Sequence, residues 1–235
     1  MRILVFQHHP TSTAGLVAER MEARGAEATV LHAEHGTAIP DDALDHHGLL
    51  LLGGTMNAYA DDLCPHFPAL LGLARTFRER QRPVLGICLG GQLLARAFGA
   101  QVHVDATHEL GLVPLQPTDA AAADPLVADT APGTHAMQWH SDTFDLPPAS
   151  VPLLTGEVCR NQAFRLDDIV YGFQCHFETD RTTMRWWGQL AVEHYGMSID
   201  REAHERAIQQ HGAEAEAFGR RIADRWLDLV AARMG

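Results

Sequence analysis

Apolar and polar residues follow two alternating patterns along the first hundred positions. Short, continuous apolar runs are typical of parallel strands buried on both faces, and they occur at residues 2–7, 28–31 and 48–52. Segments with apolar residues at helical spacing lie among them, at residues 13–24 and 68–82. We therefore predict an α/β fold with a mostly parallel central sheet and helices on both faces.

The pattern changes after about residue 100, where short strand-like pieces alternate with connections that contain Pro, Gly and Asp. These pieces are residues 101–104, 112–115, 136–139, 159–164 and 169–175. We expect them to add antiparallel strands to the sheet in the second half of the chain.

The C-terminal part is helical by spacing, with one helix at residues 181–195 and one long helix or two at 201–234. We find no internal repeat and no linker. We therefore expect a single domain over residues 1–235, with a core of about 1–180 and a helical C-terminal extension of about 181–235. The Ala/Glu/Arg-rich tail could support a homodimer, but we favour an amphipathic helix on the surface of one chain.

Composition narrows the class of protein. The 235 residues are 46% hydrophobic, which suits one large globular domain. No apolar run approaches the roughly 20 residues that span a membrane, so we expect no membrane segment. A strand-like run begins at Arg2, so we expect no signal peptide. The net charge of -12 argues against a nucleic-acid surface, which needs clustered cations.

The use of cysteine and lysine narrows the class of protein further. The four cysteines are irregularly spaced, with neither a CxxC pair nor a disulfide framework, so we expect a cytoplasmic protein. All 18 basic residues are arginine. A chain without lysine cannot use a P-loop lysine, a Schiff-base lysine or a lysine general base.

The strongest chemical signal is a Gly-x-Cys-x-Gly turn around Cys88, which a strand-like run enters and a helix-like run leaves within residues 83–95. A side chain on such a strand-to-helix turn projects from a tight bend, as in a nucleophile elbow. The first amides of the helix then point toward the thiol, where they favour a thiolate and stabilise an oxyanion. The alternative is an inert, buried cysteine beside a glycine-rich turn.

A second signal lies 88 positions downstream of the cysteine, where a strand-like run ends in His176-Phe177-Glu178. Residues i and i+2 of an extended chain share a face, so the Glu178 carboxylate can orient the His176 imidazole. A thiol, a base and an orienting carboxylate are the parts of an activated acyl-transfer nucleophile. The motif alone could equally be an ordinary polar strand end.

With these motifs the chain resembles the class I, triad-type glutamine amidotransferases, especially the amidotransferase domain of GMP synthases and its stand-alone relatives. The resemblance covers about residues 1–180 and rests on four motifs in order. They are Gly53-Gly54, Gly86-Ile87-Cys88-Leu89-Gly90-Gly91-Gln92, His140-Ser141-Asp142 and His176-Phe177-Glu178. It implies that Cys88 is the nucleophile, His176 the base and Glu178 the orienting residue. Many members carry proline where this chain has Thr55 and Phe177; neither departure removes a reacting group, and both leave the shape of the pocket, and hence the substrate, open.

The elbow geometry makes the Leu89 amide one donor of an oxyanion hole, and the resemblance implies that Gly54 supplies the other. The resemblance also implies that Gln92 and backbone groups around Met56, Ser141 and Asp142 recognise the α-amine and α-carboxylate of a glutamyl group. A solvated helix residue is the alternative for Gln92, and local capping is the alternative for His140 and Asp142.

We expect no metal and no cofactor. The histidine pairs His8-His9 and His46-His47, and the His32-x-x-His35 spacing, lack a second cluster at ligand distance. The tryptophans Trp186, Trp187 and Trp226 have spacings that favour packing.

The predicted reaction is cysteine-dependent hydrolysis of a γ-glutamyl amide, the glutaminase half-reaction of an amidotransferase. No Ser-Gly-Gly-x-Asp-Ser type loop is present, so a GMP synthase-like reaction would need a separate synthetase subunit. The alternatives are a stand-alone γ-glutamyl peptide or amine hydrolase and a non-catalytic binding module. A related class, the cysteine-elbow chaperone- or protease-like proteins, has its base much closer after the cysteine, and His103 and His108 are poor matches for that position.

Overall fold

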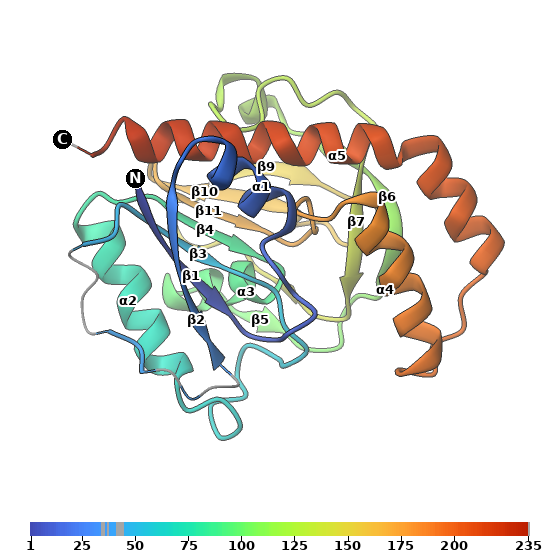
Figure 1. Cartoon of the computed structure of the whole chain (residues 1–235), viewed down its shortest axis with the longest axis horizontal. Helices are drawn as coiled ribbons and strands as arrows, with labels where there is room; N and C mark the ends of the chain where they lie inside the picture. Colours follow the sequence, from blue (N-terminus) through green and yellow to red (C-terminus); the bar gives the residue numbers. More distant parts are fainter. Residues whose placement is uncertain (34–35, 37, 41–44, 235) are drawn as a thin grey trace.

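The computed structural model describes residues 1–33, 36, 38–40 and 45–234. Within them, nine strands form one sheet in the order β2-β1-β3-β4-β11-β10-β9-β6-β7, which Figure 1 shows crossing the molecule. The five strands from β2 to β11 are parallel to one another. They are β1 (Arg2–Gln7), β2 (Glu27–His32), β3 (Gly48–Leu51), β4 (Val84–Ile87) and β11 (Val170–Phe173).

Helices cover both faces of this parallel part, as predicted. Alternate residues of each strand enter different cores, because strand side chains have a period of two. Ile3 and Val5 pack with α1 (Gly15–Ala23) and α5 (Arg201–Ala231), whereas Leu4 and Phe6 pack with the other helices. These are α2 (Phe67–Glu79) and α3 (Leu89–Ala97). The parallel strands therefore lie between two layers of helices.

The other end of the sheet is antiparallel, as expected for the second half of the chain. It consists of β10 (Ala163–Leu166), β9 (Val151–Thr155), β6 (Glu109–Pro117) and β7 (Thr134–His140). A 3₁₀ helix, η2 (Asp119–Ala123), lies in the connection between β6 and β7. A small two-stranded sheet pairs β5 (Val102–His103) with β8 (Thr143–Phe144).

Two helices complete the described chain. Helix α4 (Arg181–Glu193) lies beside β6 and β7, and α5 is one continuous helix that runs the length of the molecule (Figure 1). Each begins at an aspartate that caps it: Asp180 Oδ1 accepts from the Thr183 amide at 2.7 Å, and Asp200 Oδ1 from the Ala203 amide at 2.9 Å. The buried residues of α5, Phe218 and Trp226 among them, pack in the core of this chain, which favours the surface-helix interpretation of the tail. No helix in the described ranges is long and apolar enough to cross a bilayer.

Three details of the predicted pattern were wrong. Residues 28–31 are not buried on both faces, because β2 is the edge strand and Val30 is 41% exposed. The piece at 169–175 is parallel to β4 and antiparallel only to β10. The piece at 101–104 joins the small sheet and not the central one.

Strand β9 was missed because it contains a proline, which lowers the strand propensity of its segment. Pro152 lies opposite Phe164, where the β9–β10 register shifts, so its missing N–H leaves no regular ladder bond unmade.

Candidate active site

Cys88 lies on the turn between β4 and α3 with φ 52° and ψ -111°, a backbone conformation that non-glycine residues rarely adopt. Its amide donates to the Phe173 carbonyl at 2.8 Å, and its carbonyl accepts from the Gln92 amide at 2.9 Å. The turn is tight: a Cβ on Gly90 would lie 2.1 Å from the Leu51 carbonyl oxygen. Strained residues held this firmly are characteristic of functional sites.

His176 follows β11, and its amide donates to the Met137 carbonyl of β7 at 2.7 Å. Its Nδ1 lies 2.7 Å from Glu178 Oε1, and both side chains are buried. A Cβ on Gly53 would be 3.0 Å from His176 Cε1 and 3.6 Å from Cys88 Cβ, so base and thiol flank the same glycine. The geometry brings together the three side chains of the predicted triad.

The electrostatics of His176 suit a proton carrier. Burial alone would lower its pKa, but the negative charges of Glu178 and of the Cys88 thiolate, with hydrogen bonds to both, raise the pKa to about 10. His176 can therefore hold a proton next to the Cys88 sulfur at neutral pH. For the buried Cys175 thiol, burial itself is the largest cause of the shift, and it raises the pKa well above its usual value.

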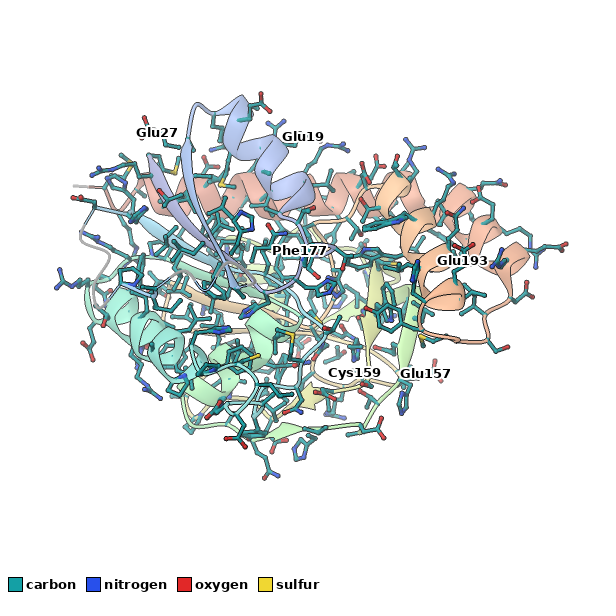
Figure 2. The ribbon with its side chains drawn as sticks, turned by 60° about the horizontal axis from the view of Figure 1, so that its bottom comes forward. Glu19, Glu27, Glu157, Cys159, Phe177 and Glu193 are labelled. Atoms are coloured by element: carbon teal, nitrogen blue, oxygen red, sulfur yellow. The ribbon has the colours of Figure 1, made fainter. Side chains whose placement is uncertain are left out.

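The segment that carries Glu178 is held from two sides, close to the labelled Phe177 in Figure 2. The Glu178 carbonyl accepts from the Leu16 amide of α1 at 2.7 Å, and a Cβ on Gly15 would lie 2.1 Å from that oxygen. On the α5 side, a Cβ on Gly219 would lie 1.9 Å from the Phe177 carbonyl oxygen. Both helices therefore approach this backbone more closely than any side chain allows.

The two predicted oxyanion donors are neighbours. Leu89 is the first residue of α3, and a Cβ on Gly54 would lie 2.8 Å from Leu89 Cδ2 and 2.8 Å from His8 Cβ. Gly54 thus closely approaches the start of the helix that follows Cys88. The use of both amides as oxyanion donors stays a prediction.

The predicted substrate-binding residues line the same cavity as Cys88 and His176, which has a volume of about 680 Å³. They are Met56, Gln92, Ser141 and Asp142. Gln92 is buried, and its Nε2 donates to Gln174 Oε1 at 3.3 Å. Asp142 Oδ1 accepts from the Asp105 amide at 2.9 Å and from Ser141 Oγ at 3.4 Å. These bonds hold Gln92 and Asp142 in place where they line the cavity.

Comparison with known proteins agrees with the geometry. The family model of the class-I glutamine amidotransferases matches residues 6–186. The chain belongs to this family. The glutamine amidotransferase-like protein YfeJ of Salmonella typhimurium is 32% identical over 184 residues, 76% of each chain. A subunit of the glutamine-hydrolysing GMP synthase of Natronomonas pharaonis is 34% identical over 145 residues, 61% of this chain and 72% of its own.

Solved structures of amidotransferases share the fold over nearly the whole chain. A glutamine amidotransferase of Methylobacillus flagellatus is 29% identical, with a TM-score of 0.86 over 97% of this chain and 94% of its own. A glutamine amidotransferase of Thermotoga maritima, 24% identical, has a TM-score of 0.85 over 98% of each chain and supports the fold alone. Helices α4 and α5 therefore belong to a fold that other amidotransferases have.

The amidotransferase cavity also has an aromatic wall that the sequence reasoning missed, formed by Trp139, Trp187 and Tyr195. The Trp187 ring meets the His176 ring edge-on at 4.7 Å between centroids. Trp139 meets both Trp187 and Tyr195 at 5.5 Å. Helical spacing indicated only that Trp187 packs, which it does, whereas Trp186 is 43% exposed. No local signal in the sequence links the three residues of the wall.

A buried polar network lies against the same cavity. Glu109 Oε2 accepts from Gln162 Nε2 at 2.8 Å and lies 3.0 Å from His140 Nε2, while His140 Nδ1 lies 2.9 Å from the Asp142 carbonyl oxygen. His140 thus bonds within the structure, as its local-capping alternative proposed. Through His140, the network holds Asp142 in place where it lines the cavity.

The histidine pairs considered as metal ligands have other surroundings. His8 packs against Phe6, His66 and Phe67, and His46 and His47 bond to Thr29 and the Arg2 amide. His35 lies outside the described residues.

Among the described residues, two other groups have side-chain ligand atoms within 4.8 Å of one another: Glu109, His140 and Cys159, and His135, His211 and Glu214. The first group is buried, with Cys159 labelled in Figure 2, and its Glu109 and His140 already bond each other. In the second group the rings of His135 and His211 are stacked 3.6 Å apart.

Proposed function

We propose that this amidotransferase-family chain is a cysteine-dependent hydrolase of γ-glutamyl amides. The observation that carries the proposal is the arrangement of Cys88, His176 and Glu178 after neighbouring parallel strands: Cys88 and His176 line one cavity, and Glu178 bonds His176 Nδ1. In an α/β sheet, ligands bind beyond the carboxyl ends of the strands. A thiol beside a buried, carboxylate-bound imidazole is the arrangement that acyl transfer requires.

The first half of the mechanism forms a thioester. The Cys88 thiolate attacks the γ-carbonyl carbon, and the amides of Gly54 and Leu89 hold the resulting oxyanion. The carbon–nitrogen bond then breaks as the His176 imidazolium gives its proton to the departing amine. The products at this stage are a free amine and a γ-glutamyl thioester on Cys88.

The second half regenerates the enzyme. Neutral His176 takes a proton from water, whose oxygen attacks the thioester carbonyl carbon. The carbon–sulfur bond breaks, so glutamate leaves and the thiolate–imidazolium pair is restored. Glu178 keeps Nδ1 of the imidazole protonated and oriented, and it carries no transferred proton. The chain's own residues supply every group in these steps.

The glutamyl end of the substrate lies on the side of the cavity formed by Met56, Gln92, Ser141 and Asp142 in this proposal. The carbonyl and carboxylate oxygens of Asp142 suit an α-ammonium, and backbone amides of the Met56 and Ser141 loops suit an α-carboxylate. We further propose that residues 1–235 form one domain and that the protein acts in the cytoplasm, where its four free cysteines remain reduced.

The second candidate function is that of an amidotransferase subunit that passes ammonia to a separate synthetase. The observation that favours it is the similarity to proteins named as subunits of glutamine-hydrolysing GMP synthases. Such a protein would hydrolyse glutamine slowly until an ATP-dependent partner binds.

Labelling with a γ-glutamyl-directed electrophile tests the proposed nucleophile. Cys88 should be modified, and its modification should match the loss of amide hydrolysis. Cys88→Ala should lose both while keeping its circular dichroism spectrum. Cys64→Ala is the matched control, since Cys64 is also buried but packs in the core beneath α2. Undiminished labelling or hydrolysis in Cys88→Ala would refute the assignment.

Assay of the isolated chain separates the two candidate functions. Steady release of glutamate from a γ-glutamyl amide by the chain alone supports the hydrolase. Near silence on every substrate, relieved by a co-purifying ATP-dependent protein, supports the ammonia-supplying partner of a synthetase.

A further inference from the structure

The cavity is larger than its glutamyl-binding part requires. Its volume of about 680 Å³ falls in the range of roughly 300–1,000 Å³ that holds drug-sized ligands. Glutamine releases only ammonia, which occupies the space of a water molecule. The space beyond the reacting carbon is therefore available to a larger leaving group.

The aromatic wall marks the leaving-group side. His176 gives its proton to the departing amine, so whatever surrounds the amine lies next to the His176 ring. That neighbour is Trp187, followed by Trp139 and then Tyr195, each ring meeting the next edge-on. The rings form a continuous path from the base to the opening of the cavity.

The outer end of this path is apolar and open to water. Tyr195 is 48% exposed, and Met197, in the same connection between α4 and α5, is 37% exposed. Val104, which also lines the cavity, is 49% exposed. Exposed apolar side chains gathered around a concave site favour burial against an apolar ligand.

Charge at the cavity argues against a charged leaving group. No arginine is among the described residues that line it, and the chain has no lysine, so a carboxylate on the leaving amine would meet no cation besides His176, which gives up its proton to the amine. Asp105 and His108 pair with each other at 3.2 Å, and the Glu109 and Asp142 side chains accept bonds within the protein. A second ammonium group would find one unbonded carboxylate oxygen, Glu109 Oε1, but it would have to leave water to pack against the aromatic wall.

We propose that the cavity accepts γ-glutamyl amides of uncharged, apolar amines, with an arylalkyl or branched alkyl group packed against the aromatic wall. This inference rests on the proposed hydrolase function and names its substrate class. The reaction is unchanged: the carbon–nitrogen bond breaks, the His176 proton passes to the arylalkylamine, and water releases glutamate.

Three substrates isolate the features of the leaving group. γ-Glutamyl phenethylamide carries the aryl group alone, γ-glutamyl-phenylalanine adds one carboxylate to it, and glutamine has neither. We expect kcat/KM for the phenethylamide to exceed that for each of the others by about tenfold or more, because the aryl group buries apolar surface and the carboxylate finds no arginine or lysine. Equal or better turnover of glutamine or of γ-glutamyl-phenylalanine would overturn the proposal.

Variants test the position of the aryl group. Tyr195→Ala should lower the ratio of kcat/KM for phenethylamide to that for glutamine by about fivefold or more, since it removes the exposed end of the wall. Trp186→Ala is the matched control: it removes a half-exposed aromatic side chain of α4 that does not line the cavity, and the ratio should stay unchanged. Equal ratios in wild type and Tyr195→Ala contradict the placement.

A binding measurement keeps the inference independent of turnover. In the Cys88→Ala protein, the phenethylamide should bind more tightly than glutamine by calorimetry, and it should quench tryptophan fluorescence. Tighter binding of glutamine overturns the substrate class even if the wild type is silent. The two proposals also fail in distinguishable ways: Cys88-dependent glutamine hydrolysis with a poor phenethylamide refutes only the substrate class, whereas activity that persists in Cys88→Ala refutes the hydrolase mechanism.

Discussion

The two sides of the cavity are built in different ways. On the thiol side, Gly54, Cys88 and Leu89 follow the adjacent parallel strands β3 and β4. The Cys88 turn is fixed by backbone hydrogen bonds to Phe173 and Gln92 and by the close approach of Gly90 to the Leu51 carbonyl. On the opposite side, the aromatic wall takes Trp139 from β7, Trp187 from α4 and Tyr195 from the connection after it. One side is positioned by backbone and the other by packed side chains.

We infer from this difference that the thiol side determines reactivity, whereas the aromatic wall determines which leaving group is accepted. Backbone positions in a packed α/β core cannot shift without breaking the sheet, so the predicted oxyanion donors and the strained Cys88 stay in place. The aromatic rings can change identity at much smaller cost to the fold, because Tyr195 is half exposed. The family model ends at residue 186, just before Trp187. In this protein the residues that we assign to leaving-group selectivity thus lie largely outside the part that matches the family.

The largest expected effect comes from a substitution next to the thiol. His176→Ala removes the group that gives and takes each proton, and we expect kcat to fall by about 10⁴-fold or more. Glu178→Gln keeps the imidazole in place but loses charge, so its effect should be about a hundredfold milder. Single-turnover and steady-state glutamate release measure both.

Two outcomes would contradict the triad arrangement: wild-type turnover in His176→Ala, or a larger loss in Glu178→Gln than in His176→Ala. Circular dichroism of each variant controls for misfolding.

The next effect concerns the support of the triad from the C-terminal helix. Gly219→Ala would force a methyl group against the Phe177 carbonyl, so we expect it to destabilise the protein by about 1–3 kcal/mol. A shift of the neighbouring Glu178 should also lower kcat by about tenfold to a hundredfold. Urea unfolding and the amide assay measure the two changes.

Gly72→Ala is the matched control for that variant. Gly72 also lies inside a helix, α2, but a Cβ there meets nothing within 4 Å. Alanine has the better helix propensity, so this variant should gain up to about 1 kcal/mol with unchanged kcat. Equal stability of the two variants would show that α5 does not press on the Phe177 backbone as described.

These contrasts explain how much the sequence could predict. The apolar strand runs and the turn at Cys88 predicted the α/β fold and the parallel sheet, because both depend on neighbours in sequence. The closeness of His176 and Glu178 was predictable for the same reason, since two residues apart on an extended chain share a face. The structure places these residues with Cys88, and their catalytic roles stay a prediction.

What the sequence could not predict depends on distant partners. An apolar run does not reveal whether its strand is central or at an edge, so the exposure of β2 was missed. The helical spacing around Trp187 indicates a buried face but not which strand it meets, and Trp139 lies 48 positions earlier. Gly219 contacts the Phe177 backbone only because the long helix α5 lies across the sheet. No local sequence pattern predicts where that helix packs.

The last and smallest effect compares two buried histidines that follow strands of the sheet. Burial, with a smaller contribution from His66, lowers the pKa of His8 from 6.5 to about 3, whereas Glu178 and Cys88 raise that of His176 from 6.5 to about 10. Between pH 3 and 6.5 the unfolded chain binds a proton at His8 that the folded chain does not, so this group makes stability rise with pH. Between pH 6.5 and 10 the folded chain holds the extra proton at His176, so stability falls with pH.

Each histidine should therefore govern one limb of the stability profile. His8→Leu should reduce the slope of unfolding free energy against pH below 6.5, by at most about 1.4 kcal/mol per pH unit, and leave the alkaline limb intact. His176→Ala should flatten the alkaline limb by at most about the same amount and leave the acid limb intact. Urea unfolding of the wild type, His8→Leu and His176→Ala between about pH 4 and 9 measures both slopes. A change in the same limb for both variants would contradict the opposite protonation of the two histidines in the folded protein.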